Sequence, residues 1–133
     1  MNISEAAKQT GLTAKAIRLY EEQGLIQPSR SASGYRQYQA RDLQDLSFLA
    51  HARAMGFGLN ECADLMSLYR NPGRASADVK ALAQNKLIEL DEQLIRLQTL
   101  RQSLQTWIDH CPGNQSPDCP IIKHLANTEA DTQ

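Results

Sequence analysis

Two cysteines near the end of the chain have the type and spacing of metal ligands. Cys111 and Cys119 bracket a short segment rich in proline, glycine and asparagine. They lie eight positions apart, so the loop between them can place two sulfurs on opposite sides of one ion. Thiolates are soft ligands, and Cu(I), with its filled d shell, accepts two of them in a line. Cys119 is also expected to start a short final helix, whose amides favour the negative charge of such a site.

Other chemistries fit parts of the same pattern and stay open at this point. His110, Cys111, Cys119 and His124 could together form a tetrahedral zinc site. The two loop cysteines could instead form a regulatory disulfide in a thiol-redox sensor. An iron–sulfur cluster is disfavoured because it needs four clustered cysteines, and the chain has three. We interpret both histidines as solvated residues at helix ends and Cys62 as an inert core cysteine.

A long helix, predicted from Ser76 to His110, leads into the cysteine loop. Apolar residues recur there at steps of three and four, broken only at Arg101, and neither glycine nor proline interrupts the run. At 1.5 Å per residue this helix is about 50 Å long. So small a chain cannot cover it, so we expect its apolar stripe to pair with a second copy. The stripe comprises Leu87, Leu90, Leu94, Leu97, Leu104 and Ile108.

The orientation of the paired helices decides what surrounds the cysteines. If the helices run antiparallel in full overlap, Cys111 of one copy approaches Ser76 and Lys80 of the other. Lys80 would then offset the charge of the thiolates. Ser76, expected to cap the long helix, supplies no third thiolate, so the site suits a +1 ion better than a +2 ion.

The first part of the chain predicts a winged helix-turn-helix. We expect a helix over residues 5–9 capped by Ser4. Thr13 is expected to cap a second helix that ends near residue 23. Two short helices joined by a tight turn are typical of this motif. Residues 27–38 follow as two short extended runs about a Ser-Gly turn, a pattern typical of a wing that lies along phosphates.

DNA binding is predicted from the placement of charge rather than from its total. Lys15 and Arg18 share the outer face of the second helix, although an ordinary solvated surface is the alternative reading. Arg53 lies on the last turn of a helix predicted over residues 41–55, which a further helix follows over 59–70. The predicted DNA-contact residues are Lys15, Arg18, Tyr20, Arg30, Tyr35, Arg36 and Arg53.

Length and composition exclude several classes of protein. A chain of 133 residues allows one small domain and an extension. A net charge of −1 and a pI near 6.3 exclude a general polyanion binder. No apolar run approaches the length of a membrane span and no signal peptide is evident, so we expect a cytoplasmic protein. Because the sequence shows no acid–base pair, activated nucleophile or phosphate-binding loop, we do not expect an enzyme.

Seven short segments carry a family resemblance. They are ISEAA at 3–7, AIRLYEEQGL at 16–25, GYRQY at 34–38, AMGF at 54–57, SADVK at 76–80, CPG at 111–113 and DCPII at 118–122. With these segments the chain resembles the MerR family of transcription regulators, and within it the copper(I) sensors of the CueR type. In that family, serine at the position of Ser76 is found in sensors of monovalent ions and cysteine in sensors of divalent ions. The chain lacks the additional Cys and His residues in the tail of some copper sensors, which are accessory.

The resemblance implies a fold and a mode of action. The fold would be mainly α, with a winged helix-turn-helix DNA-binding domain, a long antiparallel coiled-coil dimerisation helix and a C-terminal metal-binding loop. A homodimer would bind double-stranded promoter DNA at a pseudo-palindromic operator between the −35 and −10 elements, together with RNA polymerase. Without metal the dimer would repress. With Cu(I), or with Ag(I) or Au(I) as substitutes, it would activate copper-efflux genes by untwisting the DNA.

The same resemblance assigns residues and boundaries. The implied metal ligands are Cys111 and Cys119, with Ser76 and Lys80 of the other copy beside them. We divide the chain into a DNA-binding domain (1–70), a dimerisation helix (75–110), a metal-binding loop with a short helix (111–126) and a disordered tail (127–133).

Overall fold

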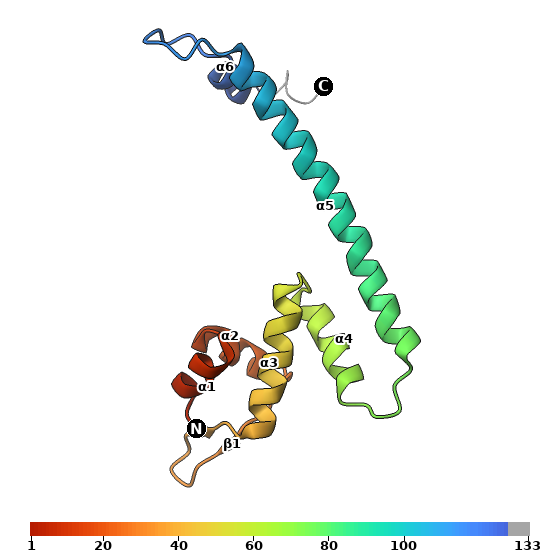
Figure 1. The fold of residues 1–133 in the computed structure, drawn as a ribbon. Coiled ribbons are helices and arrows are strands. Elements are labelled where there is room, and N and C mark those ends of the chain that lie inside the picture. The colour runs from red at the N-terminus through yellow and green to blue at the C-terminus, as the bar shows by residue number, and fades with distance from the viewer. Residues whose placement is uncertain (128–133) are drawn as a thin grey trace. The chain divides into compact units, whose positions relative to one another are not determined.

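The computed structural model describes residues 1–127, and residues 128–133 of the predicted tail lie outside the described part. Within that part the chain is mainly helical, with one two-stranded hairpin (Figure 1). This confirms the predicted helical class. Contacts divide the chain into two units, Met1–Lys86 and Leu87–Gln133. None of the helices in the described residues is long and apolar enough to cross a membrane.

The first helix, α1 (Ile3–Thr10), begins earlier than predicted. The sequence placed the cap at Ser4, but the Asn2 side chain accepts a hydrogen bond from the backbone N–H of Glu5 at 2.9 Å. Asparagine and serine are about equally good caps, so propensity alone could not choose between them. Gly11 ends the helix with a φ of 74°, in the left-handed region that glycine adopts without strain.

The second helix, α2 (Ala14–Glu22), completes the helix-turn-helix. Thr13 caps it as predicted, and its hydroxyl oxygen accepts a hydrogen bond from the backbone N–H of Ala16 at 3.0 Å. Ile17 and Tyr20 on its inner face are buried in the core. The opposite face of α2 therefore stays open to solvent.

The predicted wing is present as a short hairpin. Strands β1 (Ser29–Arg30) and β2 (Arg36–Gln37) pair in antiparallel fashion, with Arg30 opposite Arg36. Each strand has two residues. Tyr38 follows β2 and is 2% exposed, so its ring covers the core.

Helices α3 (Ala40–Ala54) and α4 (Leu59–Tyr69) complete the core of the first unit. The buried apolar residues come from all four helices, from the wing and from the segment before it. They are Ala6, Ile17, Tyr20, Leu25, Ile26, Tyr38, Leu46, Leu49, Ala52, Cys62 and Met66. Burial raises the pKa of the Cys62 thiol, so this cysteine is protonated and inert, as its place on an apolar face predicted.

The long helix α5 (Ser76–His110) has the predicted bounds. Ser76 is its first helical residue and not its cap, because the helix already begins at this position. The first turns of α5 belong to the first unit, and Lys86 is their most buried residue. Its Nζ donates to Oε1 of Glu61 at 2.8 Å and lies 5.5 Å from the ring centroid of Phe57.

The second unit contains the rest of α5 and a short final helix, α6 (Pro120–Ala126). Figure 1 shows α6 beside the C-terminal end of α5, and the cysteine loop joins the two helices. Proline suits the first helical position because it has no N–H to leave unpaired. Cys119 occupies the capping position before it in an extended conformation.

Candidate metal centre and nucleic-acid interface

The structure brings together the two cysteines that the sequence singled out. The Sγ atoms of Cys111 and Cys119 lie 3.5 Å apart, and both thiols are free. A disulfide bond would be about 2.05 Å long. Cys111 comes directly after α5, and its backbone N–H still donates to the carbonyl of Ile108 at 3.1 Å. The ends of two helices therefore fix the two sulfurs, one on each side of the loop.

The loop between the cysteines turns back through local bonds. Gly113 has a φ of 61°, which allows the chain to reverse after α5. The backbone N–H of Ser116 donates to Oδ1 of Asn114 at 2.8 Å, and that of Asp118 donates to Oγ of Ser116 at 3.3 Å. These side-chain-to-backbone bonds are the turn chemistry typical of such residues. They bring the two ends of the loop close together.

Cys119 is the more acidic type of thiol that a metal site requires. The backbone amides of α6 lie at its side chain, and their hydrogen bonds stabilise the thiolate. The pKa of Cys119 is lowered by the amide of Ile122, then by the Cys111 thiol and the amide of Ile121. Only the thiolate binds a metal ion, so a lowered pKa leaves more of the binding form at neutral pH.

The structure does not assemble the four-ligand zinc set. Nδ1 of His110 lies 2.7 Å from the carbonyl oxygen of Thr106, within α5 itself. The ring of His124 is stacked on that of Trp107, with 4.8 Å between centroids. In residues 1–127, no group of three or more His, Cys, Asp or Glu side chains is arranged to hold a metal ion. The donors that come together are two thiols, which suit a soft ion with two ligands.

Ser76 and Lys80, the residues expected beside the metal in a dimer, are exposed on the first turns of α5. They are four positions apart, so they share one face of the helix. Their approach to the cysteines of a second copy stays a prediction.

Five of the predicted DNA-contact residues are exposed, among them Arg30 in β1. Lys15 and Arg18 lie on the outer face of α2. Tyr35, in the turn of the wing, is 74% exposed. Arg53 is exposed on the last turn of α3, and its Nη1 donates to the carbonyl of Phe57 at 3.1 Å. Cations and a tyrosine on the helix-turn-helix and wing are suited to phosphate contacts.

Two arginines of the predicted set hold the wing. Arg36 forms an ion pair with Glu21, which joins β2 to α2. Nη1 of Arg30 donates to the carbonyl of Gly34 at 3.1 Å, across the turn of the hairpin. The sequence offered no sign of either partner. Both arginines help to set the position of the wing in the absence of DNA.

Tyr20 differs from the rest of the predicted DNA-contact set. Its side chain is 3% exposed and packs in the core, so its ring has no surface to offer to DNA. Burial raises the pKa of its hydroxyl, whereas the charge and hydrogen bond of Arg53 lower it. Tyr20 is therefore placed to hold the Arg53 side chain by a hydrogen bond from the core side.

The predicted apolar stripe of α5 is largely exposed in the single chain. The exposed fractions are 58% for Leu87, 55% for Leu94, 62% for Leu97, 49% for Leu104 and 54% for Ile108, and Leu90 is half-buried. Ile88, Ile95 and Leu100, which the sequence reading left out, are exposed as well. An exposed apolar stripe such as that of the six predicted residues marks an interaction site.

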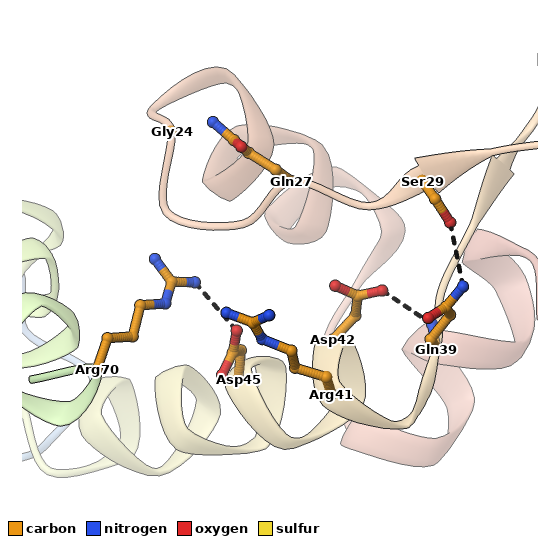
Figure 2. A pocket seen from close by; sticks show the side chains of 8 residues that line it. All are labelled: Gly24, Gln27, Ser29, Gln39, Arg41, Asp42, Asp45 and Arg70. Carbon is orange, nitrogen blue, oxygen red and sulfur yellow. Dashed lines mark hydrogen bonds and ion pairs between the residues drawn. The ribbon is translucent and has the colours of Figure 1, made fainter. Parts of the chain in front are cut away.

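A polar pocket of the first unit, with a volume of about 410 Å³, was missed by sequence reasoning (Figure 2). Its lining residues are Gly24, Gln27, Ser29, Gln39, Arg41, Asp42, Asp45 and Arg70. Nη2 of Arg70 donates to Oδ2 of Asp45 at 3.0 Å and to the carbonyl of Leu25 at 2.5 Å. The sequence feature that could have indicated this pocket is Asp45, a charged residue on the same helical face as the buried Leu49 and Ala52. These bonds tie α4 to α3 and to the segment before the wing.

A winged helix-turn-helix with an exposed basic face, followed by a long helix and a two-cysteine loop, defines a DNA-binding transcription regulator. The family model described as "MerR HTH family regulatory protein" matches residues 1–68. The family model described as "MerR, DNA binding" matches residues 43–107. The chain belongs to the MerR family and is a transcriptional regulator rather than an enzyme.

Curated relatives and a solved structure support the same family assignment. The chain is 51% identical over 126 residues to the regulator CueR of Vibrio cholerae serotype O1, covering 94% of this chain and 91% of the relative. It is 46% identical over 127 residues to the regulator HmrR of Rhizobium leguminosarum bv. viciae, covering 96% of this chain and 98% of the relative. The crystal structure of PbrR691 from Ralstonia metallidurans CH34 in complex with lead(II) matches with a TM-score of 0.78 at 28% identity, covering 94% and 98%. These matches confirm the resemblance to the CueR type.

Proposed function

We propose that this MerR-family regulator responds to Cu(I), which it binds through Cys111 and Cys119. The observation that carries the proposal is the pair of free sulfurs 3.5 Å apart. In the described residues no third His, Cys, Asp or Glu joins them as a cluster. Two thiolates satisfy a soft +1 ion, whereas a +2 ion such as zinc prefers four donors. The similarity to CueR regulators supports the same assignment.

The residues around the sulfurs would hold the ion and balance its charge. Amides at the start of α6 stabilise the Cys119 thiolate before the ion arrives. When bound, Cu(I) supplies one positive charge shared by two sulfurs. Ser76 and Lys80 of a second copy would complete the wall of the site, with Lys80 facing the remaining negative charge. Ag(I) and Au(I) are soft as well and would substitute.

DNA binding is assigned to a homodimer in the cytoplasm. The exposed apolar stripe of α5 is the surface through which two copies would pair as an antiparallel coiled coil. Two helix-turn-helix units would then reach two half-sites of a promoter. Lys15, Arg18, Tyr35 and Arg53 would contact phosphates or bases, and Arg30 and Arg36 would steady the wing. The dimer would repress without metal and activate copper-efflux genes with metal, in the presence of RNA polymerase.

An anaerobic titration tests this proposal. The wild-type protein is titrated with buffered Cu(I), Ag(I) or Zn(II), and RNA polymerase transcribes from the promoter that the protein binds. We expect Cu(I) and Ag(I) to activate transcription and Zn(II) to leave it repressed. Cys111→Ser and Cys119→Ser should bind the promoter like wild type and not respond. Activation by zinc in the absence of copper would overturn the proposal.

A second candidate function rests on the same sulfur distance. Two free thiols 3.5 Å apart can also form a disulfide, in which they lose two protons and two electrons to an oxidant such as a peroxide. The same transcription assay separates the two functions. A redox sensor responds to peroxide without copper, whereas a copper sensor responds to Cu(I) under anaerobic, reducing conditions.

A further inference from the structure

We infer that Trp107 and His124 position the two thiols by clamping α6 onto the end of α5. This pair, which we term the ring clamp, is stacked with 4.8 Å between ring centroids and 8° between the ring planes. The inference deepens the proposed function and rests on it, because it explains how this chain prepares its metal ligands. Trp107 is the only tryptophan of the chain, so the clamp has its own spectroscopic reporter.

Each ring of the clamp lies about one helical turn away from one of the two cysteines. Trp107 is four residues before Cys111 on α5, and His124 is five residues after Cys119 on α6. The sulfur pair and the ring pair therefore join the same two helices at two separate points. One contact alone leaves α6 able to rotate about it. Two contacts fix the direction of α6, and with it the place of the Cys119 sulfur.

Helix α6 has few other features that could attach it to α5. The helix has seven residues, too few to be stable without tertiary contacts. Of its large apolar side chains, Ile122 is 64% exposed and Leu125 is 60% exposed, and only Ile121 is half-buried. The turn bonds of the cysteine loop lie within the loop itself. A stacked pair of rings offsets part of the entropy of holding so short a helix.

A clamp of this kind raises metal affinity by preparing the site. If α6 were loose, the two sulfurs would lie far apart much of the time, and binding would have to restrict them. Aromatic stacking contributes enough to favour the closed arrangement by roughly two- to tenfold. The metal affinity and the rate at which a reagent bridges the two thiols should depend on the clamp to the same extent.

Thiol bridging in the metal-free protein tests the clamp without any use of copper. Dibromobimane becomes fluorescent when two neighbouring thiolates displace its two bromides, so its rate reports how often the two sulfurs meet. We expect Trp107→Leu and His124→Leu each to slow bridging by roughly two- to tenfold. The double variant should be no slower than either single variant, because one lost ring already opens the clamp. Cys111→Ser gives the background.

The conservative variant His124→Phe separates stacking from metal ligation. Phenylalanine can stack on Trp107 but cannot bind a metal, so we expect it to keep the wild-type bridging rate and Ag(I) affinity, the latter measured by competition with a chelator. His124→Leu should weaken Ag(I) by the same factor by which it slows bridging. Equal bridging rates in wild type and in both leucine variants would overturn the clamp. So would a His124→Phe variant that behaves like His124→Leu.

The outcomes also distinguish this inference from the proposed function. If bridging depends on the clamp but the wild-type protein binds neither Cu(I) nor Ag(I), the copper assignment fails and the clamp stands. If the protein binds Cu(I) but the bridging rate does not depend on the clamp, the copper assignment stands and the clamp fails. The emission of Trp107 adds a check on the structure, since His124→Leu must change it if the rings are stacked in solution.

Discussion

Lys86 of α5 and Glu61 of α4 form an ion pair of 2.8 Å, although 25 positions separate them in the sequence. The Lys86 side chain is 9% exposed, and its ammonium also lies above the ring of Phe57. The same Oε1 of Glu61 accepts a hydrogen bond from the backbone N–H of Gly58 at 2.8 Å. One carboxylate therefore fixes the first turns of α5 to the start of α4.

The Lys86–Glu61 pair predicts a pH-dependent contribution to stability. The pKa of Glu61 is lowered, chiefly by the hydrogen bond from Lys86 and then by the amide of Gly58. A carboxylate whose pKa is depressed in the folded state adds stability above its unfolded pKa and loses it as the pH falls through the folded pKa. Glu61→Gln should therefore destabilise the protein at pH 7 and have little effect at acidic pH, once the pH has fallen through the lowered pKa of Glu61.

Urea unfolding at a series of pH values measures this contribution. Asp64→Asn, a change of an exposed carboxylate on the same helix, serves as the matched control. It should shift the unfolding midpoint little at either pH. A Glu61→Gln variant with the same loss of stability at acidic and neutral pH would show that the ion pair is not the cause.

Much of the fold follows from local patterns in the sequence. The bounds of α5 were predicted correctly because a long apolar repeat without glycine or proline has few alternatives. The start of α1 was wrong because Asn2 and Ser4 cap equally well, and only tertiary context chooses between them. Thr13 was predicted correctly because Gly11 ends α1 and Thr13 directly precedes the first residue of α2.

Interactions between distant residues could not be predicted. No sequence rule pairs Lys86 with Glu61, or Arg70 with Asp45, because each pair depends on how helices pack. For the site, residue type and spacing identified the two cysteines, but their sulfur distance depends on how α6 turns back on α5. Tyr20 was placed among the DNA contacts, yet it lies on the inner face of α2 and is a core residue.

The exposed stripe of α5 predicts that charge on this face abolishes the dimer. The double variant Leu90→Asp, Leu97→Asp would bury carboxylates without partners, at a cost of several kcal/mol. We expect it to sediment as a monomer of 14.8 kDa and to bind the promoter poorly. Thr99→Asp places the same charge on the opposite face of α5 and should leave a dimer. A double variant that still forms dimers would remove this stripe from the interface.

The lowered pKa of Cys119 predicts how its reactivity depends on pH. Its thiolate should persist to lower pH than an ordinary cysteine, whose pKa is about 8.5. Alkylation by iodoacetamide, read at Cys119 by peptide mass spectrometry, should therefore have a midpoint below that value. In urea the amides of α6 no longer reach the sulfur, and the midpoint should rise to the ordinary value. Equal midpoints in the folded and unfolded protein would contradict the role of α6.

Ser76 is expected to limit the site to ions of single charge. Ser76→Cys would add a thiolate from the second copy, so we predict measurable Zn(II) binding that the wild-type protein lacks. Ser67→Cys adds a cysteine on the exposed face of α4 and should give no such binding. Zinc binding that is the same in both variants, or absent from both, would separate Ser76 from the metal site.

The central claim, that two thiolates alone hold the ion, is tested most directly by X-ray absorption at the copper edge of the Cu(I)-loaded wild-type protein. The pair formed by Cys111 and Cys119 predicts one copper per loop with two sulfur neighbours and no nitrogen ligand. A third ligand would contradict the two-thiolate site. A nitrogen contribution that disappears in His110→Phe or His124→Phe would also contradict it and would show that this histidine binds the ion.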